Sequence, residues 1–406
     1  TLVLANNTPT TASSGFGGAG ILRIESVADS FASTFDVDGN WSFGSDLGGL
    51  TIGKSSNTEL INMSSAISIT GSLTVYGGSV SVTSSMVSTS GDILIDADTG
   101  TMLSQATNGV WVSGAGVEIK TLGLNLLDGA SGDITIVGRG GDATATSNAG
   151  DRTHGVLIED GAKVLAVGDG VVSVTGIGGQ SLRTRFASGV VLVSGTNSAH
   201  ISEITAENGS VTVTGTGGSG DDKATGVLVQ AFARISTTGT GNVYVEGVAG
   251  GAGSGDNHNG VEVINSNKAS KAQPTASITT AIGDISITAT GSTTGEGLVV
   301  SDAGLIEAGG GGAIVIDTDS LSFDATPVGT DSNVASVVTN HTSSVTIRPL
   351  TAGTDMDLGG SDVLTGTLEL GLSDAELDII STGTLTLGSS DAGDVRITSD
   401  ISPALA

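Results

Sequence analysis

Short segments in which apolar and polar residues alternate recur along most of the chain, and glycine opens each of them. The first clear set is GDITIVG (132–138), GVVSVTG (170–176), GSVTVTG (209–215), GNVYVEG (241–247), GDISITATG (283–291) and GAIVID (312–317). Alternation with a period of two is typical of β-strands with one buried face, because successive side chains point to opposite sides. The pattern predicts one strand type that is used many times.

Two further strand-like segments follow each of these before the next copy begins. The second set is GVWV (109–112), GVLI (155–158), GVVLV (189–193), GVLV (226–229), GVEV (260–263) and GLVV (297–300). The third set is AGVEI (115–119), AKVLAV (162–167), AHISEI (199–204), ARISTT (233–238), ASITT (276–280) and AGLIE (303–307). Repeats of about 29–42 residues with three strands each predict a solenoid, and the absence of a 3.6-residue period excludes helical repeats.

The expected fold is all-β, a right-handed parallel β-helix in which three sheets form a triangular solenoid of roughly a dozen turns. Residues 46–406 are predicted to form one continuous solenoid. Residues 1–45 break the pattern and gather Phe31, Phe35, Trp41 and Phe43, so we expect an N-terminal cap or lead-in segment there. No equivalent cap is expected after Ile397.

Glycine-rich insertions between about residues 96 and 296 fall at one corner of the predicted solenoid, between the first and second strands. The clearest are 138–154, 176–188, 215–225 and 247–259. Their basic residues are Arg139, Arg152, Arg183, Arg185 and Lys223. These charges either keep the loops soluble or contact an acidic glycan or an acidic patch on a neighbouring copy.

A stripe of apolar residues is predicted on the outside of the second strands. Its members are Trp111, Leu157, Val191, Leu228 and Val299, with Glu262 as the exception. Soluble monomers rarely leave such a stripe bare, so either the loops cover it or another molecule does. We favour a lateral interface between copies. Val395 and Ile397, in the last strand-like segment, are predicted to make a head-to-tail contact through an unpaired edge.

The amino-acid composition and the net charge exclude some classes of function. The chain has 65 Gly, 5 Pro and no Cys among 406 residues, and its formal charge is 14 − 42 = −28. So acidic a chain is not expected to bind nucleic acid, which requires a cationic surface. No apolar run approaches the roughly 18 residues that a membrane span needs. Secreted bacterial surface proteins often lack disulfides because long stacked cores replace them, so an extracellular or cell-surface location is expected.

Catalytic and metal-binding residues are not evident in the pattern. The outward positions of the first strands are Thr135, Ser173, Thr212, Tyr244, Ser286 and Val315, with no carboxylate cluster for acid–base chemistry, so no enzyme activity is expected. The four histidines, His154, His200, His258 and His341, are interpreted as exposed polar residues. No cofactor is expected. Calcium is the open alternative, at 36–40 or 250–258, although flexible glycine turns explain both segments.

The segment 343–403 carries a more specific signature. It includes SSVTIRPLTAGTDMDLGG and LELGLSDAELDIISTGTLTLGSSDAGDVRITSDISP, and it resembles the β-strand repeats of very large secreted bacterial proteins of the filamentous-haemagglutinin type. Within it, Ser373 and Glu376 have the spacing of a capping box and predict one helical turn. The resemblance covers about one seventh of the chain and implies an extracellular rod for adhesion, matrix or cell contact.

These observations favour a non-enzymatic structural or adhesive β-solenoid, either a section of a longer rod or a filament subunit. Its main expected partner is a second copy of itself, with glycans or other cell-surface proteins as further partners. The alternative is a glycan-binding or glycan-processing β-helix. The start of the chain lacks a basic leader region, so either a leader has been removed or the chain is a segment of a longer one.

Overall fold

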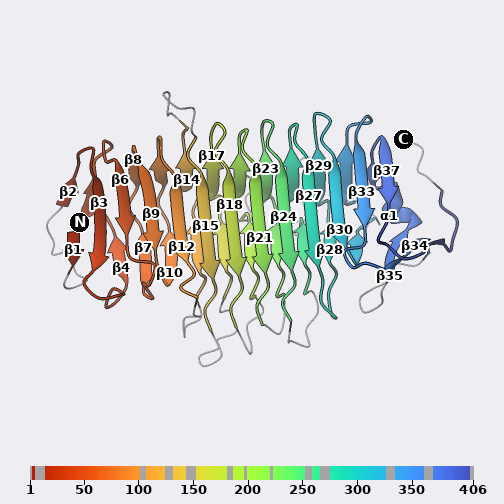
Figure 1. The fold of residues 1–406 in the computed structure, drawn as a ribbon, viewed down its shortest axis with the longest axis horizontal. Coiled ribbons are helices and arrows are strands. Elements are labelled where there is room, and N and C mark those ends of the chain that lie inside the picture. Colours follow the sequence, from red (N-terminus) through yellow and green to blue (C-terminus); the bar gives the residue numbers. More distant parts are fainter. Residues whose placement is uncertain are drawn as a thin grey trace.

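A computed structural model describes residues 2–4, 14–100, 107–123, 131–142, 152–180, 186–195, 199–219, 223–251, 258–265, 275–325, 334–360 and 369–402. In these residues the protein is an elongated stack of β-strands with one short helix, α1 (Asp374–Asp378). The two ends of the chain lie at opposite ends of the stack (Figure 1). The prediction of a parallel β-helix is confirmed.

Three long parallel sheets make up the stack. The first sheet contains, in order, β1 (Leu2–Leu4), β3 (Ile21–Ser26), β6 (Gly49–Ile52), β9 (Ser72–Tyr76), β12 (Ile93–Ala97), β15 (Ile134–Arg139), β18 (Val172–Ile177), β21 (Val211–Thr216), β24 (Val243–Val248), β27 (Ile285–Thr290), β30 (Ile314–Thr318), β33 (Ser344–Arg348) and β37 (Thr384–Leu387).

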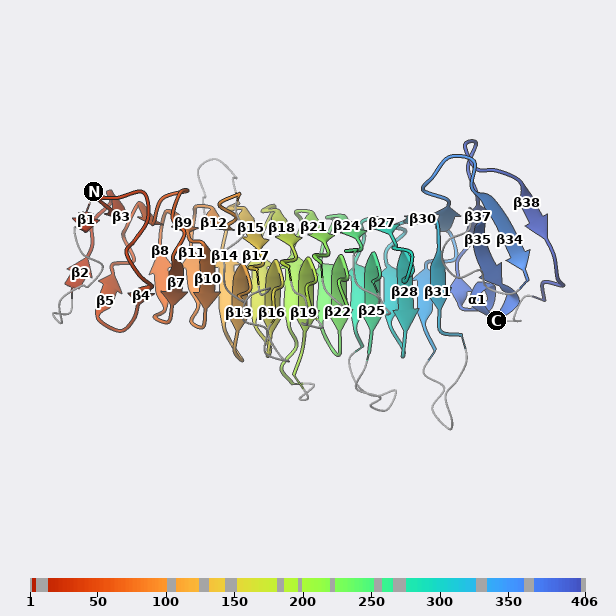
Figure 2. The same cartoon turned by 90° about the horizontal axis from the view of Figure 1, so that it is seen from below.

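The second sheet contains β4 (Phe35–Val37), β7 (Leu60–Met63), β10 (Ser79–Val82), β13 (Val110–Ser113), β16 (Val156–Glu159), β19 (Val190–Val193), β22 (Val227–Gln230), β25 (Val261–Ile264), β28 (Leu298–Ser301) and β31 (Leu321–Phe323). Figure 2 shows most of these strands side by side.

The third sheet contains β8 (Ile67–Ile69), β11 (Met86–Ser88), β14 (Glu118–Thr121), β17 (Lys163–Ala166), β20 (Glu203–Ala206), β23 (Arg234–Thr237), β26 (Ser277–Thr280), β29 (Leu305–Ala308), β32 (Ser336–Thr339) and β36 (Ile380–Ser381). From β6 to β32 the chain visits the three sheets in the same order, one strand in each per turn. The predicted three-strand period is therefore confirmed.

The inward residues of the three sheets pack into a single aliphatic core. Val211 and Val213 on β21, Val227 and Val229 on β22, and Ile235 on β23 are fully buried in it. The same alternation continues from turn to turn, so each turn adds one layer of Val, Ile or Leu side chains to the core. This burial explains why the sequence repeats short aliphatic strands rather than large aromatic residues.

A column of glycines runs along the corner where the third sheet leads into the first. Gly209 illustrates the constraint: a Cβ added to it would lie 2.0 Å from the carbonyl oxygen of Gly170, one turn earlier. Equivalent distances of 1.9–2.3 Å occur at Gly132, Gly170, Gly241, Gly283 and Gly312. Because a real Cβ cannot approach that closely, only glycine lets successive turns stack here. This is why each copy of the repeated segment begins with glycine.

In several turns the polar residue that follows the corner glycine ties its turn to the next. Asp133 Oδ1 accepts a hydrogen bond from the backbone N–H of Val171 at 2.9 Å, and Asp284 Oδ1 accepts one from Ala313 at 2.8 Å. Asp92, Ser210 and Asn242 accept the corresponding bonds in other turns. These side chains satisfy backbone donors that the corner would otherwise leave without a partner.

The N-terminal boundary differs from the prediction. Strands β3 and β4 already belong to the first and second sheets, so the predicted division at residue 46 is wrong. Phe31 and Phe35 stack in the core with ring centroids 4.6 Å apart, and Trp41 lies 5.5 Å from Phe35. Phe43 is partly buried and packs against the same core. The aromatic residues thus fill the core of these turns, beside the small sheet formed by β2 (Ser14–Phe16) and β5 (Trp41–Phe43).

The opposite end carries a small three-stranded sheet, β35 (Glu369–Ser373), β34 (Asp355–Gly359) and β38 (Val395–Ile397). Met356 and Leu370 are fully buried and join the main core. Helix α1 begins with the predicted capping box, in which Ser373 and Glu376 bond reciprocally. Glu376 Oε1 also accepts from the backbone N–H of Phe323, at the end of the second sheet. The core is therefore covered by residues that precede Ile397.

Candidate functional site

The predicted outward stripe of the second sheet exists as a register column. Trp111, Leu157, Val191, Leu228, Glu262 and Val299 are neighbours in successive turns. However, Leu157 is only 1% exposed, and Val191 and Leu228 are each 4% exposed. Trp111 and Val299 are half-buried, and Glu262 is buried. The stripe is not bare, so the lateral interface predicted from its exposure is wrong.

Residues at the bases of the corner loops cover this stripe. In each turn the stripe residue lies five positions after a loop-base residue: Leu157 after Arg152, Val191 after Phe186, and Leu228 after Lys223. Arg152 and Phe186 are paired by a parallel β-bridge, which sets these loop bases in register. The apolar cluster that results contains Leu157, Val191 and Leu228, with Trp111, Val193 and Ile264 packed against it.

Between the loop bases and the sheet lies a cavity of about 200 Å³. It is lined by Arg152, His154, Leu157, Phe186, Val191, Val193, Lys223, Leu228 and Gln230. The floor is aliphatic, one wall is an aromatic ring, and two cationic side chains stand beside it. We refer to this space as the loop-base cavity.

Glu159 organises one side of the loop-base cavity. Its Oε2 accepts from Arg152 Nη1 at 2.7 Å, and its Oε1 accepts from Trp111 Nε1 at 2.8 Å. The carboxylate is largely buried between these two donors. It therefore fixes both the indole ring and the guanidinium group next to the apolar stripe.

The remaining predicted loop-corner residues fall into two groups. Arg139 pairs with Asp98, with 2.7 Å between Arg139 Nε and Asp98 Oδ1, and this hydrogen bond lowers the pKa of the Asp98 carboxyl. Arg183 and Arg185 lie outside the described residues. Arg139 and Arg152 are thus paired with carboxylates of their own chain.

Two of the four histidines are buried, contrary to the prediction. His154 Nδ1 accepts from the backbone N–H of Ser188, and His258 Nδ1 accepts from that of Ala224. Burial, with a smaller contribution from the charge of Arg152, lowers the pKa of His154 to about 3. His200 and His341 are exposed, as predicted. Each buried ring satisfies a backbone donor of an adjacent turn, which isolated sequence positions do not reveal.

Buried carboxyl groups lie further along the same corner. Asn259 Nδ2 donates to Glu262 Oε2 at 3.1 Å, and Asn259 Oδ1 accepts from the backbone N–H of Glu296 at 2.9 Å. Burial raises the pKa of both glutamates. Among the described residues, no group of three or more His, Asp or Glu side chains is placed to hold a metal ion.

The structure describes all of the first candidate calcium-binding segment, 36–40, but only part of the second, 250–258. In 36–40, Asp38 accepts bonds from the backbone and side chain of Asn40, and Asp36 accepts from Asn62. These oxygens therefore have partners within the chain. Residues 252–257, most of the second candidate, lie outside the described residues.

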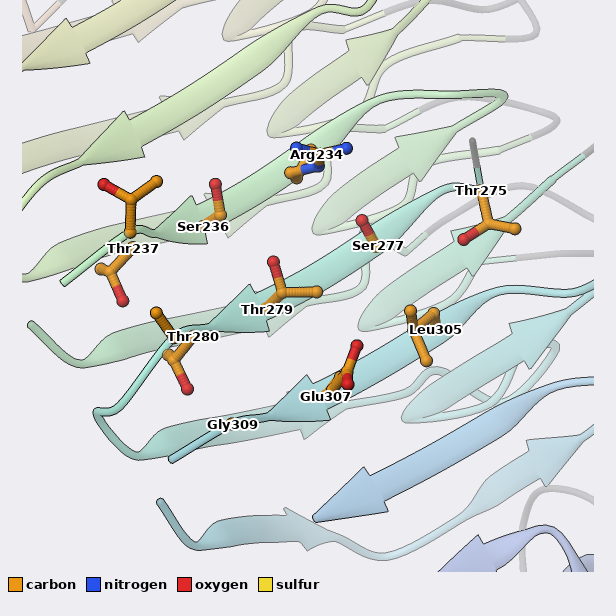
Figure 3. A pocket seen from close by; sticks show the side chains of 12 residues that line it. Arg234, Ser236, Thr237, Thr275, Ser277, Thr279, Thr280, Leu305, Glu307 and Gly309 are labelled. Carbon is orange, nitrogen blue, oxygen red and sulfur yellow. The ribbon is translucent and has the colours of Figure 1, made fainter. Parts of the chain in front are cut away.

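A shallow groove of about 670 Å³ crosses the outer face of the third sheet over β23, β26 and β29. Figure 3 shows Ser236 beside Arg234 on β23, and Ser277 and Thr279 on β26 between Arg234 and Glu307. On the N-terminal side of the groove, the same face carries a column of alternating charges, Glu118, Lys163, Glu203 and Arg234. The groove opens where Ser277 takes the next position in this column. We refer to it as the hydroxyl groove.

No protein-family model, curated protein or solved structure matches this chain. No helix in the described part of the chain is long and apolar enough to cross a membrane.

His154 should make stability depend on pH. Its pKa is about 3 in the folded protein, against an ordinary value of 6.5, so on acidification the unfolded chain binds a proton that the folded protein does not. Stability present above about pH 6.5 is therefore lost as pH falls toward 3. The variant His154→Gln keeps an acceptor without titrating, so its unfolding midpoint should fall less than that of the parent between about pH 7 and pH 4.5.

Thermal unfolding followed by circular dichroism measures this difference. The exposed His200→Gln variant is the matched control and should behave as the parent does. Equal losses of stability in the parent and in His154→Gln would contradict the assignment.

Proposed function

We propose that the protein is an extracellular structural or adhesive β-solenoid, a rod section or filament subunit that contacts further copies of itself end to end. The observation that carries this proposal is the exposed strand β38. Val395 is 51% exposed and Ile397 is 69% exposed, and β38 pairs with β34 alone among the described strands. An edge strand with two exposed aliphatic residues can accept another strand.

The position of β38 also supports this contact. It lies at the end of the solenoid, on the outside of the small sheet formed with β34 and β35 (Figure 2). Strand addition there would lengthen the rod and would bury Val395 and Ile397 together. The strand falls within residues 343–403, the segment that resembles filamentous-haemagglutinin-type repeats, whose members form extracellular rods. The acidic composition and the lack of cysteine are consistent with secretion to the cell surface.

Replacing Val395 and Ile397 together with lysine tests the end contact. The exposed positions should tolerate the change in the monomer, while two charges at the edge should prevent strand addition. We expect the parent to form end-to-end oligomers at high concentration, seen by light scattering and electron microscopy, and the double variant to remain monomeric.

The matched control is Val171→Lys with Ile282→Lys, since both residues are exposed aliphatics away from β38. This control should assemble as the parent does. A parent that remains monomeric at high concentration, or a β38 variant that assembles normally, would contradict the end contact.

Glycan binding is the second candidate function, and the hydroxyl groove favours it. Its floor presents Ser and Thr hydroxyls from two successive turns, flanked by the guanidinium of Arg234 and the carboxylate of Glu307. Hydroxyl groups both donate and accept hydrogen bonds, the Arg234 guanidinium donates them, and the Glu307 carboxylate accepts them. This mixture suits the hydroxyl groups of a sugar chain, which also donate and accept. The groove runs along the solenoid, so an extended ligand could span several turns.

A glycan array with the parent and Ser277→Arg tests this second function. The long side chain should fill the groove floor, so binding of any recognised glycan should be lost. Ser286→Arg, on the outer face of the first sheet, is the control and should bind as the parent does. No binding by the parent, or undiminished binding by Ser277→Arg, would rule out glycan recognition at this groove.

A further inference from the structure

The loop-base cavity has no role in the proposed end contact. Its lining follows a regular repeat in the sequence, which distinguishes it from an incidental void between side chains. Three consecutive turns each supply one floor residue and one wall residue, at the same spacing of five positions. The floor residues Leu157, Val191 and Leu228 are at least 96% buried, and Phe186 lines the same cavity. An apolar cavity of about 150 Å³ can hold a benzene-sized molecule, so a space of about 200 Å³ has room for a small organic ligand.

The charges beside the cavity determine which ligand it suits. Lys223 and Arg152 both line it, on a protein whose formal charge is −28. One carboxylate oxygen of Glu159 already bonds Arg152 and the other bonds Trp111, so Glu159 compensates Arg152 only. Glu262, in the turn after Leu228, receives a hydrogen bond from Asn259. No ion pair joins the Lys223 ammonium to a carboxylate among the described residues; burial raises the pKa of the Glu262 carboxyl, and the charge of Lys223 lowers it.

The backbone of Lys223 is held in an unusual conformation. Its φ is +49°, in the left-handed region that residues with a Cβ rarely adopt. Its carbonyl accepts from Ser188 Oγ at 3.1 Å, and the next residue, Ala224, donates its backbone N–H to His258. Strained residues fixed by their surroundings are typical of binding sites. The bonds on both sides of Lys223 therefore position its side chain next to the apolar floor.

We propose that the loop-base cavity binds a small organic monoanion, with an apolar body of about six carbons over Leu157, Val191 and Leu228 and a carboxylate facing Lys223. Phe186 lines the cavity beside the apolar body, and the pairing of Arg152 with Glu159 leaves Lys223 as the cation that faces the carboxylate. Benzoate has this size and charge. A neutral molecule of the same shape would bury the same apolar area but would leave the ammonium without a counterion.

Isothermal titration calorimetry of the full chain with benzoate, and with benzamide as the neutral isostere, tests the proposal. Benzoate should bind at one site per chain, and benzamide should bind at least about tenfold more weakly. Lys223→Gln should weaken benzoate binding by about tenfold and leave benzamide binding unchanged. Val191→Phe should fill the cavity and remove binding of both ligands.

Lys163→Gln, on the outer face of the third sheet, is the matched control for the lost charge and should bind benzoate as the parent does. Circular dichroism establishes that each variant is folded. If Val191→Phe does not fold, the comparison of benzoate with benzamide and the Lys223→Gln variant still decide the matter. No binding of benzoate at about 10 mM, equal affinity for the two ligands, or full affinity in Lys223→Gln would overturn the proposal.

Loss of the end-to-end contact in the β38 variant would leave benzoate binding unaffected. The two proposals can therefore fail separately. A side chain from a second copy is the competing occupant of the cavity. In that case the parent would form dimers, Val191→Phe would abolish them, and benzoate would not dissociate them. This result would also overturn the proposal.

Discussion

The close approach of successive turns at the corner between the third and first sheets is the constraint on which this structure depends. At Gly209 and its equivalents, a single added carbon would lie about 2 Å from a carbonyl oxygen of the preceding turn. With glycine there, the turns can stack at the spacing of β-strands, and the following Asp, Ser or Asn can reach the backbone N–H of the next turn. Stacking at this corner sets the register of the strands that follow, so equivalent residues form columns along the rod.

These columns explain where the surface features lie. A column of long charged residues on the third sheet ends at Arg234, and small hydroxyl residues after it create the hydroxyl groove. A column of aliphatic residues on the second sheet becomes the floor of the loop-base cavity because Arg152, Phe186 and Lys223 occupy a parallel column above it. On a solenoid, a change in residue size or charge along a column therefore changes the shape of the surface at that turn.

The period-two alternation was sufficient to predict the fold and most inward residues, including Val211 and Val213. It also placed Leu157, Val191 and Leu228 correctly on the outer face. Their exposure was predicted wrongly because burial there depends on residues five positions earlier, which fold back across a corner. The strand expected within 199–204 lies at Glu203–Ala206, since Ser202 bonds to Ser194, Val193 and Gly161 and forms a turn instead. The capping box at Ser373 was predictable because its partners are local, whereas the partners of His154 and Glu376 lie in other turns.

The substitution Gly209→Ala tests the central claim most directly, because it adds one carbon where two turns approach closely. The account predicts that it lowers the free energy of unfolding by about 1–3 kcal/mol or more, measured by chemical denaturation. Gly39→Ala is the matched control: no atom lies within 4 Å of its added Cβ, so it should leave stability nearly unchanged. A Gly209→Ala protein as stable as the parent would contradict the claim that glycine at this corner allows the turns to stack.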